Sequence, residues 1–278
     1  MAQPKRKEKE RAADAPAPAE APPQTGEAPW KPPAKLSRNA LLALGGLVVL
    51  ANLPLLHYAL RGEQEVTAQV PYRDDFSDRT TVERSYWSTG GHWRTINGWL
   101  FSPGVKNNPL WLKARLPRDV AVEFDVRSEV PEGDIKVEIF GDGLNHASGY
   151  VLIHGGWNNS LSIIARRDEH GPSLGLLQQQ ARQVAASQGL QSANLVDTGV
   201  FRKDTRMRVE AHPYPVQMSK VYHWRIERKG TALRWSIDGK PFMELDDPFP
   251  LEGTGHDRFG FSSWEAQLYF DNLSITPL

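Results

Sequence analysis

Residues 222–242, "YHWRIERKGTALRWSIDGKPF", decide how the C-terminal part of this chain folds. Apolar and polar residues alternate through 222–230 and again through 232–239, which is the pattern of half-buried β-strands. The compact turns "RKGT" and "DGK" separate the strands, and Asp238-Gly239 has the composition of a type I′ hairpin turn. The stretch therefore predicts consecutive antiparallel hairpins.

Similar short strands fill most of the chain after residue 72. Gly, Pro, Asn or Asp punctuate their ends, and amphipathic helices do not alternate with them. The predicted strands are 110–116, 121–129, 134–141, 149–154, 160–167, 222–230, 232–239, 259–264 and 268–275. This pattern predicts an all-β fold, an antiparallel β-sandwich (jelly roll), over 72–278.

One segment breaks the alternation. The stretch "SLGLLQQQARQVAASQGL" (173–190) has good helix formers, no proline and a glycine near its end, which predicts a short helix. It lies in an insertion at about 168–219, whose last part, 206–219, contains two prolines and is expected to form an edge strand and a loop. Insertions at a rim either carry function or are decorative, and both alternatives stay open.

The N-terminal segment has a different composition. Pro, Ala, Glu and Lys dominate residues 1–38, where Trp30 and Leu36 are the large apolar residues after Met1. Such a segment cannot bury enough apolar surface to offset the entropy of ordering, so a disordered tail is predicted. A plain flexible tail is favoured over a polyproline ligand.

The next stretch, "NALLALGGLVVLANLPLLHYAL" (39–60), has about 21 mostly apolar residues without a formal charge, close to the roughly 20 that span a bilayer. A core helix would lack a packing partner, and the 38 residues before it exceed the basic segment of a signal peptide. A transmembrane helix is predicted, followed by a linker (61–71).

Basic residues set the expected orientation. They are frequent in the tail, whereas Glu63 and Glu65 follow Arg61 directly after the span. The tail is therefore expected in the cytoplasm, with the sandwich on the periplasmic or extracellular side of a cell inner membrane. The lipid bilayer is then one partner of the chain.

Composition excludes several classes of function. The chain has no cysteine, which removes disulfides, thiolate metal sites and thiol nucleophiles. Its 33 basic and 33 acidic residues give a formal net charge of zero, so nucleic acid is not expected as a partner. The histidines show no metal-binding spacing such as HExxH.

Three stretches resemble a known superfamily. They are "YRDDFSDR…YWSTGGHWRTINGWLFS" (72–102), the central "VAVEFDVRSE…GYVLIHGGWNNSLSIIARR", and the end, where a hairpin around "DG" precedes a closing strand with "FDN". Over 72–278, apart from the insertion, the chain resembles the concanavalin A-like lectin/glucanase superfamily of laminin G-like jelly rolls. The resemblance implies the fold and not one function, because the superfamily holds lectins, glycosidases, sugar-binding modules and structural domains.

Calcium is the one metal that the resemblance suggests. Some members hold a structural calcium, and Asp271-Asn272 in "FDN" is the corresponding place here. Hydrogen bonding within the closing turn is the favoured interpretation, so no cofactor is expected.

The strand "AVEFDVRSEV" (121–130) contains the acidic residues Glu123, Asp125 and Glu129. Glycosidases that resemble laminarinases carry Glu-x-Asp-x-Glu or Glu-x-Asp-x-x-Glu, one residue shorter than the spacing here. Retaining hydrolysis needs carboxyl groups about 5–5.5 Å apart, whereas six extended steps separate the Cα atoms of Glu123 and Glu129 by about 20 Å. With Arg127 among them, these residues predict a solvated strand face, and no catalytic residue is assigned.

The stretch "HGGWNNS" (154–160) has the groups that a sugar needs. Two glycines permit a close turn, Trp157 offers a stacking plane, and Asn158 and Asn159 offer amide donors and acceptors. The favoured alternative is a Gly-Asn hairpin turn with a core tryptophan.

Further candidate binding residues lie on later predicted strands. An exposed tryptophan beside an arginine would suit a glycan that bears carboxylates or phosphates. Tryptophans that flank one hairpin, such as Trp224 and Trp235, would equally form core. The additional candidates are Arg166, Trp224, Trp264 and Glu265.

These observations predict a membrane-anchored extracytoplasmic domain that binds carbohydrate or another envelope component without catalysis. One alternative is a glycoside hydrolase or lyase with carboxylates from different strands, for example Glu265 with Glu138. Another is a structural adaptor in an envelope protein assembly, docked through the insertion.

Overall fold

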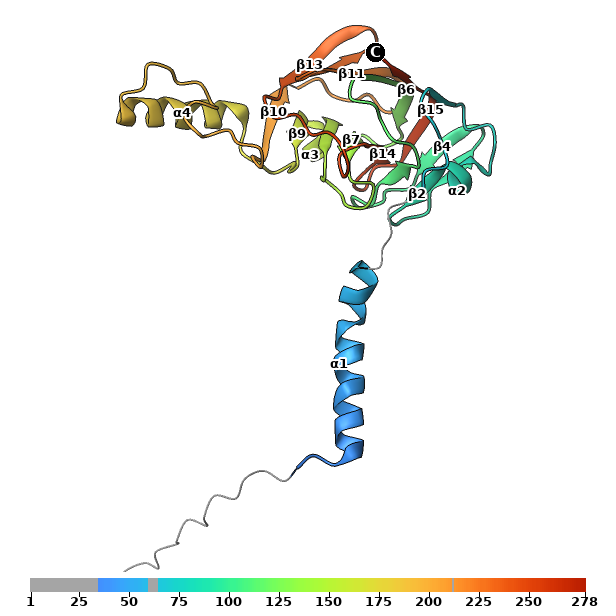
Figure 1. Ribbon diagram of the computed structural model, residues 1–278. Helices are drawn as coiled ribbons and strands as arrows, with labels where there is room; N and C mark the ends of the chain where they lie inside the picture. The colour runs from blue at the N-terminus through green and yellow to red at the C-terminus, as the bar shows by residue number, and fades with distance from the viewer. Residues whose placement is uncertain (1–34, 60–64, 212) are drawn as a thin grey trace, which may run out of the picture. The chain divides into compact units, whose positions relative to one another are not determined.

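The computed structural model describes residues 35–59, 65–211 and 213–278 (Figure 1). The chain divides into two compact units, Met1–Arg61 and Gly62–Leu278. The predicted disorder of the tail falls almost entirely outside the described residues.

Helix α1 (Arg38–Ala59) forms where the apolar stretch predicts it. Its segment Arg38–Leu56 has a mean hydropathy of 1.9, and none of this segment is buried. The side-chain amide of Asn52 donates to the carbonyl of Val48 at 2.7 Å, so one of its donors is paired within the helix itself. The helix is long and apolar enough to span a membrane, while the crossing itself stays a prediction.

The second unit is a sandwich of two antiparallel sheets, which confirms the all-β prediction. Sheet A has the strand order β13-β12-β11-β6-β15-β4-β3, and β1 pairs with β15. Its strands are β1 (Tyr72–Asp74), β3 (Arg94–Ile96), β4 (Trp99–Ser102), β6 (Val120–Ser128), β11 (Tyr222–Lys229), β12 (Ala232–Ile237), β13 (Lys240–Asp246) and β15 (Leu268–Pro277).

Sheet B has the strand order β10-β9-β8-β7-β14-β5-β2. Its strands are β2 (Tyr86–Ser88), β5 (Leu110–Leu112), β7 (Ile135–Gly141), β8 (Tyr150–Gly155), β9 (Leu161–Arg166), β10 (Met207–Ala211) and β14 (Arg258–Ser262). Three helices, α2 (Thr81–Ser85), α3 (Gly156–Asn159) and α4 (Leu174–Gln188), lie in the connections.

Strand β6 shows how the alternating pattern is used. Its apolar residues are buried in the core between the sheets, and the polar residues between them are partly exposed. The outer side chains form ion pairs: Glu123 with Arg225, Asp125 with His223 at 2.8 Å, and Arg127 with Glu129 at 2.6 Å. The predicted solvated face is confirmed.

The C-terminal hairpins fold as predicted. Asp238 and Gly239 link β12 to β13 and both have positive φ, 51° and 72°, as a type I′ turn requires. The rings of Trp224 and Trp235 contact each other in the core, with centroids 4.3 Å apart. These two tryptophans therefore belong to the core.

The insertion contains the predicted helix, α4. The hydroxyl of Ser173 accepts from the backbone N–H of Leu176, and Gly189 ends the helix in the left-handed conformation with a φ of 67°. Figure 1 shows α4 beside the β9–β10 edge and outside the two sheets. The returning chain forms β10, which pairs with β9 as the predicted edge strand, although it ends at Ala211.

Candidate functional site

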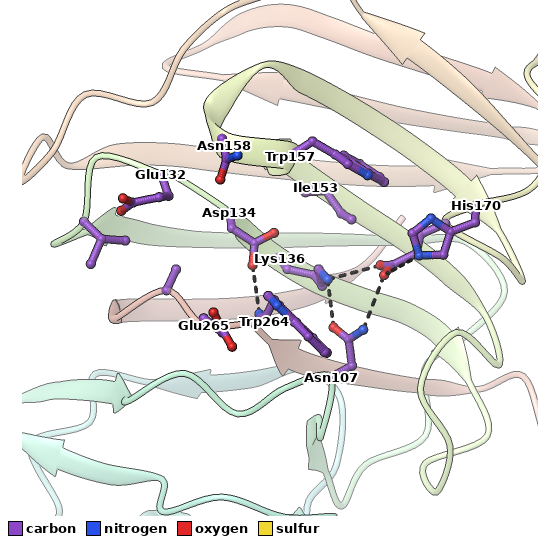
Figure 2. Close-up of a pocket in the computed structure, with 13 residues that line it drawn as sticks. Asn107, Glu132, Asp134, Lys136, Ile153, Trp157, Asn158, His170, Trp264 and Glu265 are labelled. Carbon is purple, nitrogen blue, oxygen red and sulfur yellow. Dashed lines mark hydrogen bonds and ion pairs between the residues drawn. The ribbon is translucent and has the colours of Figure 1, made fainter.

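A cavity of about 720 Å³ lies on the outer face of sheet B, where several connections meet (Figure 2). Lys136 and Ile153 pair across β7 and β8, while their neighbours Ile135 and Val137 point into the core, so this pair faces outward. The lining residues are Asn107, Val130, Glu132, Asp134, Lys136, Ile153, Trp157, Asn158, Glu169, His170, Trp264, Glu265 and Ala266.

A left-handed turn between β8 and β9 presents Trp157. Gly155, Trp157, Asn158 and Asn159 all have positive φ, from 50° to 67°. This conformation costs an L-residue roughly 1–2 kcal/mol, and asparagine tolerates it better than tryptophan. The turn leaves the Trp157 side chain 40% exposed, with its ring edge-on to His170 at a centroid distance of 5.8 Å.

Asn159 holds this turn in place. Its side-chain amide donates to the carbonyls of Pro131 at 2.9 Å and Val216 at 2.7 Å, and its oxygen accepts from the backbone N–H of Val216 at 2.7 Å. The turn is thereby fastened to the β6–β7 loop and to the end of the insertion. Asn159 does not line the cavity, whereas its neighbour Asn158 does.

The loop that carries Trp264 is hydrogen-bonded to the loop that contains Lys106 and Asn107. The backbone N–H of Lys106 donates to the carbonyl of Trp264 at 2.8 Å, and that of Asn107 donates to the carbonyl of Ser263 at 2.9 Å. The Trp264 side chain remains 47% exposed. Figure 2 shows Trp157 and Trp264 on opposite sides of Asp134 and Lys136, so the two rings form opposing walls.

A buried row of charges begins at the floor of the cavity, with Lys136 and Glu169, and continues behind it. The Lys136 ammonium, with its side chain 3% exposed, donates to Asn107 Oδ1 at 2.8 Å and to Glu169 Oε2 at 3.1 Å. Glu169 lies 3.6 Å from His146 Nε2, and His146 Nδ1 lies 2.6 Å from Glu138 Oε1. Positive and negative groups therefore alternate along the row.

The row keeps two of its members, His146 and Glu169, ionised. Burial alone would lower the pKa of His146, but the hydrogen bonds with Glu138 and Glu169 outweigh it and raise this pKa to about 9. Burial alone would raise the pKa of Glu169, but His146 and the charge of Lys136 outweigh it and lower this pKa to about 2. At neutral pH the imidazolium and this carboxylate are both charged.

Asp134 lies beside Lys136, but its pKa is shifted in the opposite direction to that of Glu169. Burial raises the pKa of Asp134, against the opposing charge of Lys136 and the hydrogen bond from the Trp264 backbone. That bond, at 2.8 Å, uses Oδ2. Among the described residues no group donates to Oδ1, so Asp134 offers the cavity one free acceptor.

Four predicted residues come together at this cavity: Trp157, Asn158, Trp264 and Glu265. Glu265 lies at the edge, where its exposed carboxylate is 3.6 Å from the ammonium of Lys106.

Arg166 and Trp224 are fully buried, so they are not part of the candidate site, contrary to the prediction. Arg166 donates to Asp247 Oδ2 at 2.7 Å and to the carbonyls of Lys203 and Phe249 at 2.9 and 2.8 Å. It ties the insertion to the chain that follows β13. Trp224 packs against Trp235 in the core.

The carboxylates suggested for hydrolysis do not share the cavity. Glu138 is fully buried, bonded to His146 and to the backbone N–H of Ala147 at 2.8 Å, and does not line the cavity with Glu265. At the suggested calcium position, Asp271 Oδ1 accepts from the N–H of Asn272 at 2.7 Å, and the Asn272 amide donates to Asp125 Oδ2 at 2.8 Å.

Sequence reasoning missed Asn107, Asp134, Lys136, Glu169 and His170 as lining residues. One signal was present: Lys136 and Glu138 alternate with isoleucine and valine in "DIKVEIF", which places them on the outer face of a strand. The sequence did not indicate which loops cover that face.

The fold and the site define an antiparallel β-sandwich with a loop-built polar cavity between two exposed tryptophans. No family model matches the chain, and no curated protein matches it. Solved structures of similar shape include the carbohydrate-binding module CBM66 from Bacillus subtilis, 15% identical, with a TM-score of 0.48 over 69% of this chain and 95% of that chain.

Two further similar structures are a protein of unknown function and a sialidase. The former, from Bacillus subtilis, has a galectin-like fold and is 13% identical, with a TM-score of 0.43 over 74% of this chain and 94% of that chain. The sialidase is 11% identical, with a TM-score of 0.49 over 77% of this chain and 19% of that chain. At these identities and scores we draw no functional conclusion from the similarity.

Proposed function

We propose that the sandwich binds carbohydrate, without catalysis, in the cavity between Trp157 and Trp264. The supporting observation is that two half-exposed tryptophans form opposing walls around a polar floor. Sugar rings have apolar C–H faces that stack on aromatic rings and hydroxyls that need donors and acceptors. The cavity offers both.

The backbone around both tryptophans supports a role in binding. Large aromatic side chains stabilise a protein most when they are buried, yet a left-handed turn and two interlocked loops hold these two rings at the surface. Strained backbone that persists in a folded protein is concentrated at functional sites. The exposure of Trp157 is thus a specific feature of this turn.

We further propose that α1 anchors the sandwich in a membrane, with the basic tail in the cytoplasm and the sandwich outside it. The supporting observations are the apolar composition of α1 and the basic residues before it. In a cell inner membrane this orientation puts the sandwich on the same side as the polysaccharides of the envelope.

A second candidate function, glycoside hydrolysis, is favoured by one observation. Burial raises the pKa of Asp134, as in a general acid. Release of reducing ends from a polysaccharide, abolished in D134N, would support hydrolysis. Binding of the same polysaccharide without release of reducing ends would support the non-catalytic function.

The binding function is tested with the full chain in detergent against a panel of soluble polysaccharides, by affinity electrophoresis. Because an aromatic stacking contact contributes about 0.5–1.5 kcal/mol beyond the apolar area that it buries, W157A and W264A should each weaken binding about tenfold. Trp87, 45% exposed and outside the cavity, gives the matched control W87A, which should bind normally. Lack of binding to every polysaccharide, or equal loss in W87A, would contradict the proposal.

An envelope protein as partner is the remaining alternative. Replacing residues 174–200 of the insertion by a short Gly-Ser linker should leave carbohydrate binding intact, because this stretch contributes no lining residue. Loss of a co-purifying envelope protein, together with no glycan binding by the native chain, would favour the adaptor.

A further inference from the structure

The floor of the cavity offers one hydrogen-bond donor beside one acceptor. An ammonium group has three N–H donors. Two donors of Lys136 reach Asn107 and Glu169, and among the described residues the third has no partner. The free acceptor is Oδ1 of Asp134, since Oδ2 accepts from Trp264. Both side chains line the cavity between the two tryptophans (Figure 2).

The donor is charge-balanced. Lys136 and His146 are the positive members of the buried row, and Glu169 and Glu138 are the negative members, so the row has no net charge. A buried ammonium without such partners would attract anions strongly. Here the carboxylates of the row balance the charge of Lys136. A ligand in the cavity therefore meets the ammonium mainly as an N–H donor.

The other charged groups make the cavity negative. Asp134 and Glu132 line it without an ion-pair partner among the described side chains, and Glu265 is balanced by Lys106 at 3.6 Å. In a cavity walled by aromatic rings, these carboxylates would repel a carboxylate, sulfate or phosphate on a ligand.

The chemistry of donor and acceptor then selects the ligand group. A carboxylate or sulfate accepts hydrogen bonds but cannot donate to Asp134, and an ammonium donates but cannot accept from Lys136. A hydroxyl does both, so a pair of neighbouring hydroxyls satisfies the two floor groups together.

We infer that the site selects a neutral glycan whose recognised sugar unit places neighbouring hydroxyls on Asp134 and Lys136, and that it excludes anionic glycans. This inference rests on the proposed function and deepens it. A ligand that lacks the hydroxyls would leave two desolvated polar groups unpaired, which is how a hydrogen-bonding site discriminates strongly.

The test compares neutral glucan, mannan, galactan and fructan with carboxymethylated derivatives of the same chain length, using the full chain in detergent. At least one neutral polysaccharide should bind, and its carboxymethylated form should bind at least tenfold more weakly. Because a neutral ligand carries no charge whose interaction salt could screen, its binding should change less than twofold between about 50 mM and about 500 mM salt.

The variant D134N separates this inference from the proposed function. Asparagine tolerates the positive φ of residue 134, 55°, and its oxygen can still accept from Trp264, but its NH₂ group cannot accept from a hydroxyl. Affinity for the neutral polysaccharide should fall at least tenfold. The control E244Q changes an exposed carboxylate on β13, paired with Arg234, and should bind like the native protein.

The outcomes are distinct. If W157A and W264A lose binding while D134N matches E244Q, or if the carboxymethylated glycan binds as tightly as the neutral one, the inference is overturned and the proposed function stands. If no glycan binds, both are overturned. The variant K136M gives a second test, because it removes the floor donor. It should also lose affinity for the neutral glycan, and its melting temperature shows whether the variant is folded.

Discussion

The backbone N–H of Trp264 donates a hydrogen bond of 2.8 Å to Oδ2 of Asp134. One carboxylate therefore fixes the loop that carries a wall of the cavity and offers its other oxygen at the floor. The position of the aromatic ring and the position of the polar acceptor depend on the same side chain.

This relationship predicts different effects for two substitutions of Asp134. D134A removes the acceptor of Trp264 and places alanine at a φ of 55°. The free energy of unfolding should therefore fall by about 1.5–3 kcal/mol, the usual contribution of a hydrogen bond to a charged group, and further because of the backbone strain of alanine there. D134N retains an acceptor and should lose clearly less. Urea denaturation measures both, and an equal loss in the two variants would contradict the anchoring role of Oδ2.

The left-handed turn before Trp157 predicts that Gly155 cannot be replaced. A Cβ atom at Gly155 would lie 2.3 Å from Asn159 Oδ1 and 2.8 Å from a Val216 methyl group, at a φ of 67°. At Gly239, with a φ of 72°, the same atom would meet nothing within 4 Å.

The variant G239A should therefore cost only the conformational strain, roughly 1–2 kcal/mol of unfolding free energy. G155A should cost at least about 1 kcal/mol more and weaken glycan binding, since Asn159 must move. Melting temperatures and affinities measure these effects, and similar values for the two variants would show that Asn159 does not fix the turn.

The raised pKa of His146 predicts a loss of stability in mild alkali. Its pKa is about 9 in the folded protein and about 6.5 when unfolded, so the folded state holds this proton more tightly. The contribution of this proton to the free energy of unfolding is at most about 3 kcal/mol. It is fully present below pH 6.5 and disappears as the pH rises through 9.

Urea midpoints measured from pH 6 to 10 check this expectation. H146L removes the titrating group, so its midpoint should vary less with pH than that of the native protein, although it should be less stable at pH 7 because Glu138 loses its partner. Parallel curves for the two proteins would mean that His146 does not hold its proton in this way.

The absence of cysteine gives a direct test of membrane orientation. S37C lies just before α1, and S187C lies at an exposed position of α4. The basic residues before α1 predict that a membrane-impermeant maleimide labels S187C in intact cells or spheroplasts and labels S37C only after lysis. The reverse labelling would invert the orientation, and the native chain serves as the unlabelled control.

Local patterns were sufficient to predict most of the strands and the two longest helices, α1 and α4. Alternation defined β6, β11 and β12, Asp238-Gly239 defined a turn, and an uncharged apolar stretch defined α1. These features depend on residues close together in the sequence, where periodicity and turn preferences act directly.

The candidate site could be predicted only in part. Trp157 and Trp264 stood out by residue type, but Asp134 and Lys136 face them only because β7 pairs with both β8 and β14, an order that alternation does not encode. Arg166 was misassigned because a buried arginine looks like an exposed one in a sequence, and its partner Asp247 lies 81 residues away.

The two ends of the insertion are held beside the cavity by contacts with the turn that carries Trp157. His170, near its start, contacts Trp157, and Val216, near its end, is bonded to Asn159. Between these points, β10 belongs to sheet B, whereas the arm formed by α4 and the loop that follows it lies outside the two sheets (Figure 1). The length of this arm can therefore change over evolution, or the arm can receive a foreign domain, without shifting the tryptophan. The arm is where we expect homologues to diverge most in size, and where a reporter can be inserted.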